Sequence, residues 1–287
     1  MQIESFFDPA THTASHLLLD TASGQCAVVD PVRDYDARSG RTRTHSADRL
    51  IQRVRELGAR LAWILETHVH ADHLSAAPVL QQELGGQVGI GRHVLQVRQH
   101  FERLFPSADD ADLGKPPFDH LFDDGEIFHI GQVALQALHT PGHTPACMSY
   151  CVQTQPGAVF VGDTLFMPDH GTARCDFPGG DAQTLWHSVQ RLLQLPPDTV
   201  LYTCHDYQPG GRDLRLSCTV QEQREHNVHV HQGIEMADFV RMRRTRDATL
   251  EVPTLLLPSL QVNLRGGVLP PAQVNGLRYL KIPLNAI

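Results

Sequence analysis

The sequence predicts an α/β fold with a layered core, and three observations support this fold class. Short apolar segments typical of buried strands alternate with segments typical of helices through about the first 220 residues. The second half of this stretch repeats the layout of the first: strands, a histidine loop, strands, a helix, and a last strand that ends in histidine. Polar clusters follow the ends of apolar strands, where rigid α/β scaffolds carry their chemistry.

In the first half, strands are predicted from apolar runs bounded by turn residues. The turn at residues 20–24 makes a hairpin of two of them. Ser46 can cap a helix that runs to Leu57, and further helices are predicted at 74–84 and 93–104. The predicted strands cover residues 3–7, 16–19, 26–29, 61–65 and 88–90.

In the second half, Asp181 can cap a helix that runs to Leu193, and residues 109–117 are read as an acidic, proline-rich loop. Beyond about residue 220 the composition shifts to an arginine-rich segment compatible with a helix, 239–250, and then to an apolar segment rich in Pro and Gly. We expect a catalytic domain over 1–225 and a C-terminal extension, 226–287, packed on the same domain. The remaining predicted strands cover 126–128, 133–138, 147–152, 158–161 and 199–203.

Composition narrows the class of protein and its partners. The 287 residues carry a formal net charge of −8 and no basic tract, so a nucleic-acid partner is not expected. No apolar run approaches the ~20 residues that span a bilayer, and the N-terminus lacks the pattern of a secretory signal, so no membrane partner is expected either. The six cysteines are scattered, which indicates reduced thiols and a cytoplasmic location. The oligomeric state stays open, although apolar residues 255–257 could cover a second copy in a homodimer.

Four polar clusters, each at the end of an apolar strand, predict a metal site. His68, His70, Asp72 and His73 crowd into six residues, and such side chains are costly to bury unless something binds them. Three further groups follow later strands in the same way: His143, Asp163 and His205. Gly162 before Asp163 permits a close backbone approach. Imidazole and carboxylate ligands suit zinc, iron or manganese, and the lack of clustered thiolates argues against a structural zinc site.

Other histidines and cysteines are interpreted as structural residues rather than as metal ligands. His226, His229 and His231 lie in a polar segment without a flanking strand and are expected on a solvated helix face. Cys147 and Cys151 fit the two-residue alternation of a strand and are expected in the core.

The ordered set His68-x-His70-x-Asp72-His73, His143, Asp163 and His205 resembles the motif of the metallo-β-lactamase superfamily over roughly residues 1–225. The resemblance implies an αββα sandwich with the metal at the sheet edges. Within the superfamily the chain looks most like the persulfide dioxygenases. Three stretches carry this likeness: residues 67–77, 162–166 and 171–177. Ala173 and Cys175 depart from the family pattern, in which a glycine and a threonine stand at these positions.

The resemblance to persulfide dioxygenases implies one Fe(2+) per chain, held by His68, His143 and Asp163 as the catalytic centre. His70, Asp72, His73 and His205 would then orient the ligands. The implied reaction oxidises glutathione persulfide with O2 to sulfite and glutathione. A cation should hold the substrate carboxylates. The candidates for substrate binding are Arg174, Tyr207 and Arg265, with an ion pair to Asp176 or Asp181 as the alternative role of Arg174.

Two other functions stay open on the sequence. The same seven residues resemble the ligands of two-zinc hydrolases such as glyoxalase II. In that reading His68, His70 and His143 hold one metal, the set Asp72, His73 and His205 holds the other, and Asp163 bridges them. Residues 174–177 and the tail at 258–265 favour the dioxygenase by resemblance. The third reading is a metal- or persulfide-binding protein without turnover.

Overall fold

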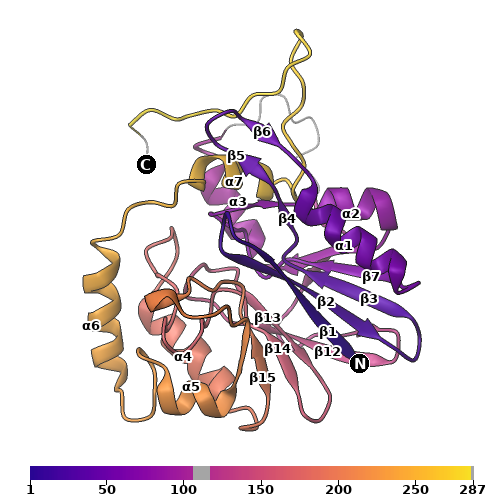
Figure 1. The fold of residues 1–287 in the computed structure, drawn as a ribbon. Coiled ribbons are helices and arrows are strands. Elements are labelled where there is room, and N and C mark those ends of the chain that lie inside the picture. The colour runs from indigo at the N-terminus through magenta and orange to yellow at the C-terminus, as the bar shows by residue number, and fades with distance from the viewer. Residues whose placement is uncertain (106–116, 286–287) are drawn as a thin grey trace.

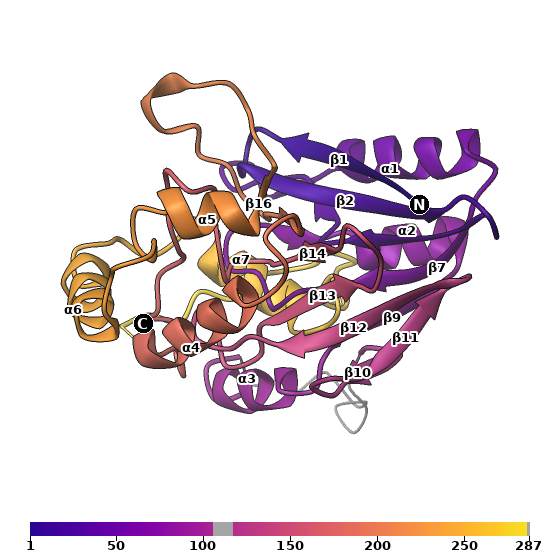
Figure 2. The ribbon, with the colours of Figure 1, turned by 90° about the horizontal axis from the view of Figure 1, so that it is seen from below.

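Two six-stranded sheets lie face to face, and helices cover their outer faces (Figures 1 and 2). This arrangement is that of a computed structural model, which describes residues 1–105 and 117–285. Apart from its last residue, the loop predicted at 109–117 lies outside the described residues. The α/β class and the αββα sandwich expected from the sequence are confirmed.

The first sheet runs in the order β1-β2-β3-β7-β9-β10, with β3, β7, β9 and β10 parallel to one another. Its strands are β1 (Gln2–Asp8), β2 (Thr13–Asp20), β3 (Gln25–Val29), β7 (Arg60–Leu65), β9 (Gln87–Gly91) and β10 (His120–Phe122). The hairpin of β2 and β3 around residues 20–24 is confirmed. Three short strands, β4 (Val32–Arg33), β5 (Tyr35–Asp36) and β6 (Arg41–Thr42), follow β3 and were not predicted.

The second sheet runs in the order β11-β12-β13-β14-β15-β16 and is antiparallel except where β14 and β15 pair. Because β12 and β14 both pair antiparallel with β13, the strands β12, β14 and β15 all point the same way. The strands are β11 (Ile127–Ile130), β12 (Val133–His139), β13 (Met148–Val152), β14 (Ala158–Phe160), β15 (Val200–Tyr202) and β16 (Ser217–Thr219).

Side chains alternate between the two faces of each strand, so each sheet is buried on both faces. One hydrophobic core lies between the two sheets, and one lies between each sheet and its helices, which gives four layers of secondary structure. Along β2, Leu18 enters the core between the sheets, whereas Leu17 and Leu19 face the helices on the first sheet. The core between the sheets includes Phe122, Tyr150 and Phe160. Cys147 and Cys151 are buried as predicted, and all six cysteines are buried and free of disulfide bonds.

Two predicted helix starts in the first half are wrong. The first helix, α1 (His45–Glu56), begins before Ser46, whose hydroxyl donates to Asp34 instead of capping. The second, α2 (Ala77–Leu84), begins three residues later than predicted because Leu74–Ser75 form a short strand, β8, that pairs with β4. Helix α3 (Val94–Phe101) lies within the range predicted for it.

The helices of the second half cover the second sheet. Asp181 caps α4 (Ala182–Leu193) as predicted, accepting a hydrogen bond from the Thr184 backbone N–H. Helix α5 (Val220–His226) was not predicted, and α6 (Met236–Asp247) packs on α4 through Phe239 and Trp186. Within the described residues, no helix is both long and apolar enough to cross a bilayer.

The C-terminal segment reaches back over the first sheet. Helix α7 (Leu256–Asn263), which the sequence analysis did not predict, contacts β8 next to the histidine loop. Residues 264–285 then form an arm that projects from the body (Figure 1). Gln261 on α7 holds this arm by a reciprocal pair of hydrogen bonds with the Lys281 backbone. The division of the chain at residue 225 stays a prediction.

Candidate metal centre

The four predicted clusters meet at one edge of the sandwich. Strands β3 and β7 are parallel, so the residues that follow them, Asp30 and the loop 66–73, emerge at the same end of the first sheet. Strands β12, β14 and β15 deliver His143, Asp163 and His205 at one end of the second sheet. The Ala14 backbone N–H donates to the Cys204 carbonyl at 2.7 Å, which joins the two sheets at this edge.

His68, His143 and Asp163 have the spacing of ligands to one ion. Asp163 Oδ2 lies 3.8 Å from His68 Nε2 and 3.6 Å from His143 Nε2. Donors that bind one first-row metal at ~2.1 Å cannot lie more than ~4.2 Å apart, so these distances fit. All three side chains are buried. The structure therefore brings the set predicted for a single iron within the distance that ligands of one metal ion can have.

The other oxygen of Asp163 faces a second group of donors. Asp163 Oδ1 lies 3.4 Å from His205 Nε2, and His205 Nε2 lies 3.2 Å from Asp72 Oδ2. The ring of His73 is 6.5 Å from that of His205. Asp163 thus stands between two groups of ligands, which is the position a bridging carboxylate would take. The geometry accommodates one metal or two.

Hydrogen bonds fix the direction in which the histidines present their free nitrogens. The Nδ1 of His143 donates to the Arg174 carbonyl at 2.7 Å, and that of His205 donates to the His12 carbonyl at 3.1 Å. His68 Nδ1 lies 3.0 Å from Thr67 Oγ1, whose hydroxyl donates to Asp30. Such partners set the tautomer of a metal-binding imidazole and leave the other nitrogen as the ligand.

Five buried atoms around Asp163 have no hydrogen-bond partner among the described residues, and this is the observation that tests whether a metal fits. Buried polar atoms are nearly always paired, so a cluster of unpaired ligand atoms fits the binding of a cation. Burial also lowers the pKa of His68 well below its usual value and that of His73 to about 3, so both are neutral donors. The five atoms are His68 Nε2, His70 Nδ1, His73 Nε2, Asp163 Oδ1 and His205 Nε2.

His70 is oriented by two carboxylates that the sequence analysis missed. Its Nε2 donates to Asp30 at 2.9 Å and lies 3.5 Å from Glu66. Burial opposes a charge on His70, but the Asp30 carboxylate outweighs burial and raises the pKa of His70 well above its usual value. Asp30 follows a buried strand, as the recognised clusters do, and that position could have identified it.

Two more residues of this edge were not assigned a role from the sequence. The Cys204 thiol shares potential ligand positions with His70 and His73, and also with Asp163 and His205. Burial raises its pKa well above the usual value, so the protonated thiol is favoured. Asn263 on α7 holds the histidine loop from behind: its Nδ2 donates to the carbonyls of His70 and His73, and its Oδ1 accepts from the Ser75 N–H.

The close approach expected at Gly162 is confirmed. Gly162 has a φ of +52°, and a Cβ added there would lie 2.6 Å from Thr67 Oγ1. Only glycine fits this conformation without strain. Gly162 therefore lets the turn that carries Asp163 pack closely against Thr67, the residue that contacts Asp30 and His68.

The three candidate substrate contacts lie in different surroundings. Tyr207 stacks on the ring of His205, with 5.6 Å between ring centroids, and is partly exposed. The guanidinium of Arg174 pairs with Asp176 and donates to the Glu251 carbonyl, as in the alternative role considered for it. Arg265 is half-buried two residues beyond Asn263.

The interpretation of the late histidines needs correction. His226 ends α5 and is exposed, as expected of a solvated helix face. His229 instead lies outside any helix and is buried, with its Nδ1 accepting from the Thr172 backbone N–H at 3.0 Å. The residues beside His229 in the sequence are polar, which is why a solvated position was expected and the contact with Thr172 was not.

Comparison with known proteins agrees with this geometry. The sequence model of the Metallo-beta-lactamase superfamily matches residues 11–205. A probable metallo-hydrolase of Burkholderia pseudomallei is 56% identical, with both chains covered completely. Glyoxylase B2 of Dictyostelium discoideum is 44% identical over 99% of this chain and 97% of its own. Longer relatives from Xylella fastidiosa are named beta-lactamase hydrolase-like protein, and the chain spans 65% of their length.

The dioxygenase resemblance also has counterparts among known proteins. The mitochondrial persulfide dioxygenase ETHE1 of Homo sapiens is 31% identical over 94% of this chain and 90% of its own. The crystal structure of ETHE1 from Myxococcus xanthus superposes with a TM-score of 0.73 at 28% identity, covering 93% of this chain and all of that one. The chain therefore belongs to the metallo-beta-lactamase superfamily and is a homologue of the ETHE1 persulfide dioxygenases.

Proposed function

We propose that the protein is an iron-dependent persulfide dioxygenase. The observation that carries the proposal is the close set of His68, His143 and Asp163, two imidazoles and one carboxylate with their free atoms converging. Two imidazoles and one carboxylate are the ligand set of non-haem Fe(II) oxygenases. Homology to ETHE1 over nearly the whole chain supports the same activity.

The proposed reaction converts glutathione persulfide, O2 and water to glutathione and sulfite. Both atoms of O2 and the oxygen of water end on the terminal sulfur, and the S–S bond breaks so that glutathione leaves as the thiol. A single Fe(2+) on these ligands would supply open coordination positions where sulfur and oxygen can meet. The protein holds its ligands in place: the Arg174 carbonyl orients His143, and Thr67 orients His68.

Two measurements test the proposal. Protein purified without chelators should contain close to one iron per chain and should consume O2 when glutathione persulfide is added. His143→Ala should lose both iron and O2 uptake, because it removes one of three ligands. His187→Ala, a histidine of α4 outside the centre, is the matched control and should keep both. Protein loaded with iron that leaves O2 unconsumed would rule the proposal out.

A second candidate is a dinuclear zinc hydrolase of thioesters. Two observations favour it: Asp163 lies between two groups of donors, and the chain is 44% identical to a protein named glyoxylase B2. A hydrolase would contain two zinc ions per chain and cleave S-lactoylglutathione. His205→Ala should then remove one of two metals, whereas in the dioxygenase the iron content should stay near one.

The proposal also covers the partners of the protein and its location. We propose glutathione persulfide and O2 as the small-molecule partners, with a substrate role for Tyr207, whose ring stacks on that of His205. The cytoplasm is the proposed location, supported by six buried cysteines of which none is paired. A protein that binds persulfide and metal without turnover would show binding in calorimetry and no O2 uptake.

A further inference from the structure

A buried ion pair on α6 lies beside the loop that orients His143. Arg243 is 2% exposed and Asp247 is 5% exposed, and their side chains pair across four residues of the helix. Charged side chains are costly to bury, and a buried pair that serves only stability can often be replaced by apolar residues without loss. A role for this pair must therefore come from the hydrogen bonds that it makes to other segments.

Both side chains of the pair bind the backbone of the loop 172–175. Arg243 Nη1 donates to the Thr172 carbonyl at 3.1 Å, and Asp247 Oδ2 accepts from the Cys175 N–H at 2.8 Å. These contacts join residues that are 71 and 72 positions apart in the sequence. Because they bracket the middle of the loop, they fix the position of the peptide groups between them.

The peptide group between Arg174 and Cys175 connects Asp247 to His143. Its N–H donates to Asp247, and its carbonyl accepts from His143 Nδ1 at 2.7 Å. This peptide is trans, so its N–H and C=O lie in one plane and point in opposite directions. The two hydrogen bonds therefore continue one another, from the carboxylate through one amide to the imidazole.

Such a path changes how strongly the imidazole can bind a metal. A negative carboxylate at the N–H leaves more electron density on the carbonyl oxygen, because the amide is conjugated. Hydrogen bonds in a chain strengthen one another in this way by about 10–30% per bond. The carbonyl then accepts more strongly from Nδ1, and Nε2 becomes a stronger electron donor. Carboxylates that contact a metal-binding histidine directly have the same effect.

We propose that Asp247, held by Arg243, is a positioning residue of the metal centre that acts on His143 through the peptide group 174–175. The inference rests on the ligand role that the proposed function gives to His143. The two-zinc hydrolase gives His143 the same role, so the inference does not depend on which reaction follows. It assigns a function to two residues of α6 that the sequence analysis did not select.

Asp247→Asn tests the path, because it removes the charge and keeps an oxygen that can accept from the Cys175 N–H. In zinc-loaded protein the Nδ1 proton of His143, assigned by its loss in His143→Ala, should move upfield in the NMR spectrum, because its hydrogen bond is weaker. Chelator competition should show that the variant binds zinc about tenfold more weakly than wild type.

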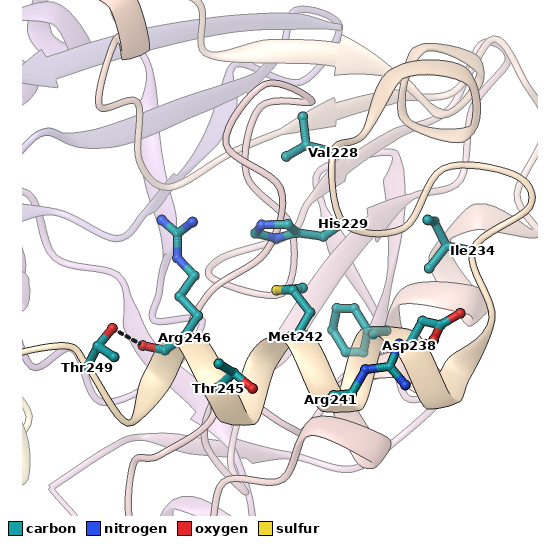
Figure 3. A pocket seen from close by; sticks show the side chains of 10 residues that line it. Val228, His229, Ile234, Asp238, Arg241, Met242, Thr245, Arg246 and Thr249 are labelled. Carbon is teal, nitrogen blue, oxygen red and sulfur yellow. Dashed lines mark hydrogen bonds and ion pairs between the residues drawn. The ribbon is translucent and has the colours of Figure 1, made fainter.

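Asp238→Asn is the matched control on the same helix. Asp238 pairs with Arg241, and both line a pocket beside α6 (Figure 3). The change removes the same charge and breaks an ion pair of the same kind, but it does not alter the contacts of α6 with the loop 172–175. The Nδ1 proton and the zinc affinity should stay at their wild-type values.

A double variant keeps the test valid if Asp247→Asn does not fold. The single change leaves the charge of Arg243 buried without its partner, which can destabilise the protein. Arg243→Met combined with Asp247→Asn leaves neither charge of this pair. It should unfold in urea near the wild-type midpoint and still show the upfield shift of the Nδ1 proton.

The outcomes separate this inference from the proposed function. A Nδ1 proton and a zinc affinity that stay at wild-type values in the single and double variants would overturn the role of Asp247, whether or not the protein consumes O2. Weaker zinc binding without a shift of the proton would overturn the path through the peptide group. A shifted proton in protein whose iron-loaded wild type leaves O2 unconsumed would support the role of Asp247 and refute the dioxygenase.

Discussion

Replacing Asn263 should loosen the metal loop without touching any metal ligand. Asn263 ends α7, nearly 200 residues beyond the loop, and its side chain makes three hydrogen bonds with the loop backbone. Two run from Nδ2 to the carbonyls of His70 and His73, at 2.9 and 2.8 Å, and one runs from the Ser75 N–H to Oδ1 at 2.8 Å. The side chain is 4% exposed, so water cannot readily replace these bonds.

The expected loss of stability follows from the loop groups that lose their hydrogen-bond partner when Asn263 is replaced. Asn263→Ala leaves two carbonyls and one N–H of the loop unpaired in a buried place. A net contribution of ~1 kcal/mol per hydrogen bond gives about 3 kcal/mol of lost stability, of which the better helix propensity of alanine returns ~0.5 kcal/mol. Because groups that orient metal ligands change affinity by roughly 10- to 100-fold, we expect metal binding to weaken within that range.

Asn263→Asp tests whether the effect of Asn263 comes from its hydrogen-bond donors or only from its size and shape. The carboxylate has the size of the amide and can still accept from the Ser75 N–H, but it has no donor for the two carbonyls. Its negative charge would face the carbonyl oxygens of His70 and His73, so it should weaken metal binding at least as much as alanine does.

The assay is urea unfolding of the metal-free protein together with chelator competition for the metal. Ser259→Ala is the matched control, because Ser259 is a buried residue of the same helix whose hydroxyl has no hydrogen-bond partner within the described part of the chain. It should change stability by less than ~0.5 kcal/mol. If Asn263→Asp bound metal as tightly as wild type, Asn263 would not position the loop.

Three further predictions concern other parts of the molecule. Asp181→Ala should lower the free energy of unfolding by ~1 kcal/mol, because it removes the cap of α4. The Thr184 N–H lowers the pKa of Asp181 in the folded protein, so this stabilisation is present above the unfolded pKa of ~3.9 and is lost as pH falls through the lower folded value. Thermal unfolding across pH should show this dependence in the wild type and not in Asp181→Asn. Gly162→Ala should lower the free energy of unfolding in urea by at least ~1–2 kcal/mol and reduce the amount of bound metal, because φ is +52° and the added Cβ would collide with Thr67. An unchanged metal content would contradict this prediction. The arm, residues 264–285, should bind a second copy of the chain, because it has three basic residues and no acidic one in a chain of net charge −8 and exposes the apolar side chains Val274, Leu277, Ile282 and Leu284. Light scattering should show a dimer that becomes a monomer when residues 268–287 are deleted, and a full-length chain that is monomeric would disprove the prediction.

The sequence by itself predicted where most strands lie and which side chains are candidate metal ligands, because both predictions rest on local patterns. An apolar run such as residues 61–65 predicts a strand whatever surrounds it, and four ligand-type side chains after it indicate a metal. Asp181 could be recognised as a helix cap for the same reason, since its bond to Thr184 spans three residues. The helix start at Ser46 was wrong because the hydroxyl has a partner, Asp34, outside the local pattern.

Only the tertiary structure decided how the metal loop is supported and where the charged groups point. Asn263 reaches the loop across nearly 200 residues, His229 finds Thr172 across 57, and no periodicity encodes either contact. Long-range hydrogen bonds and ion pairs arise from how the layers pack, and packing is a property of the whole chain, so short patterns cannot reveal them.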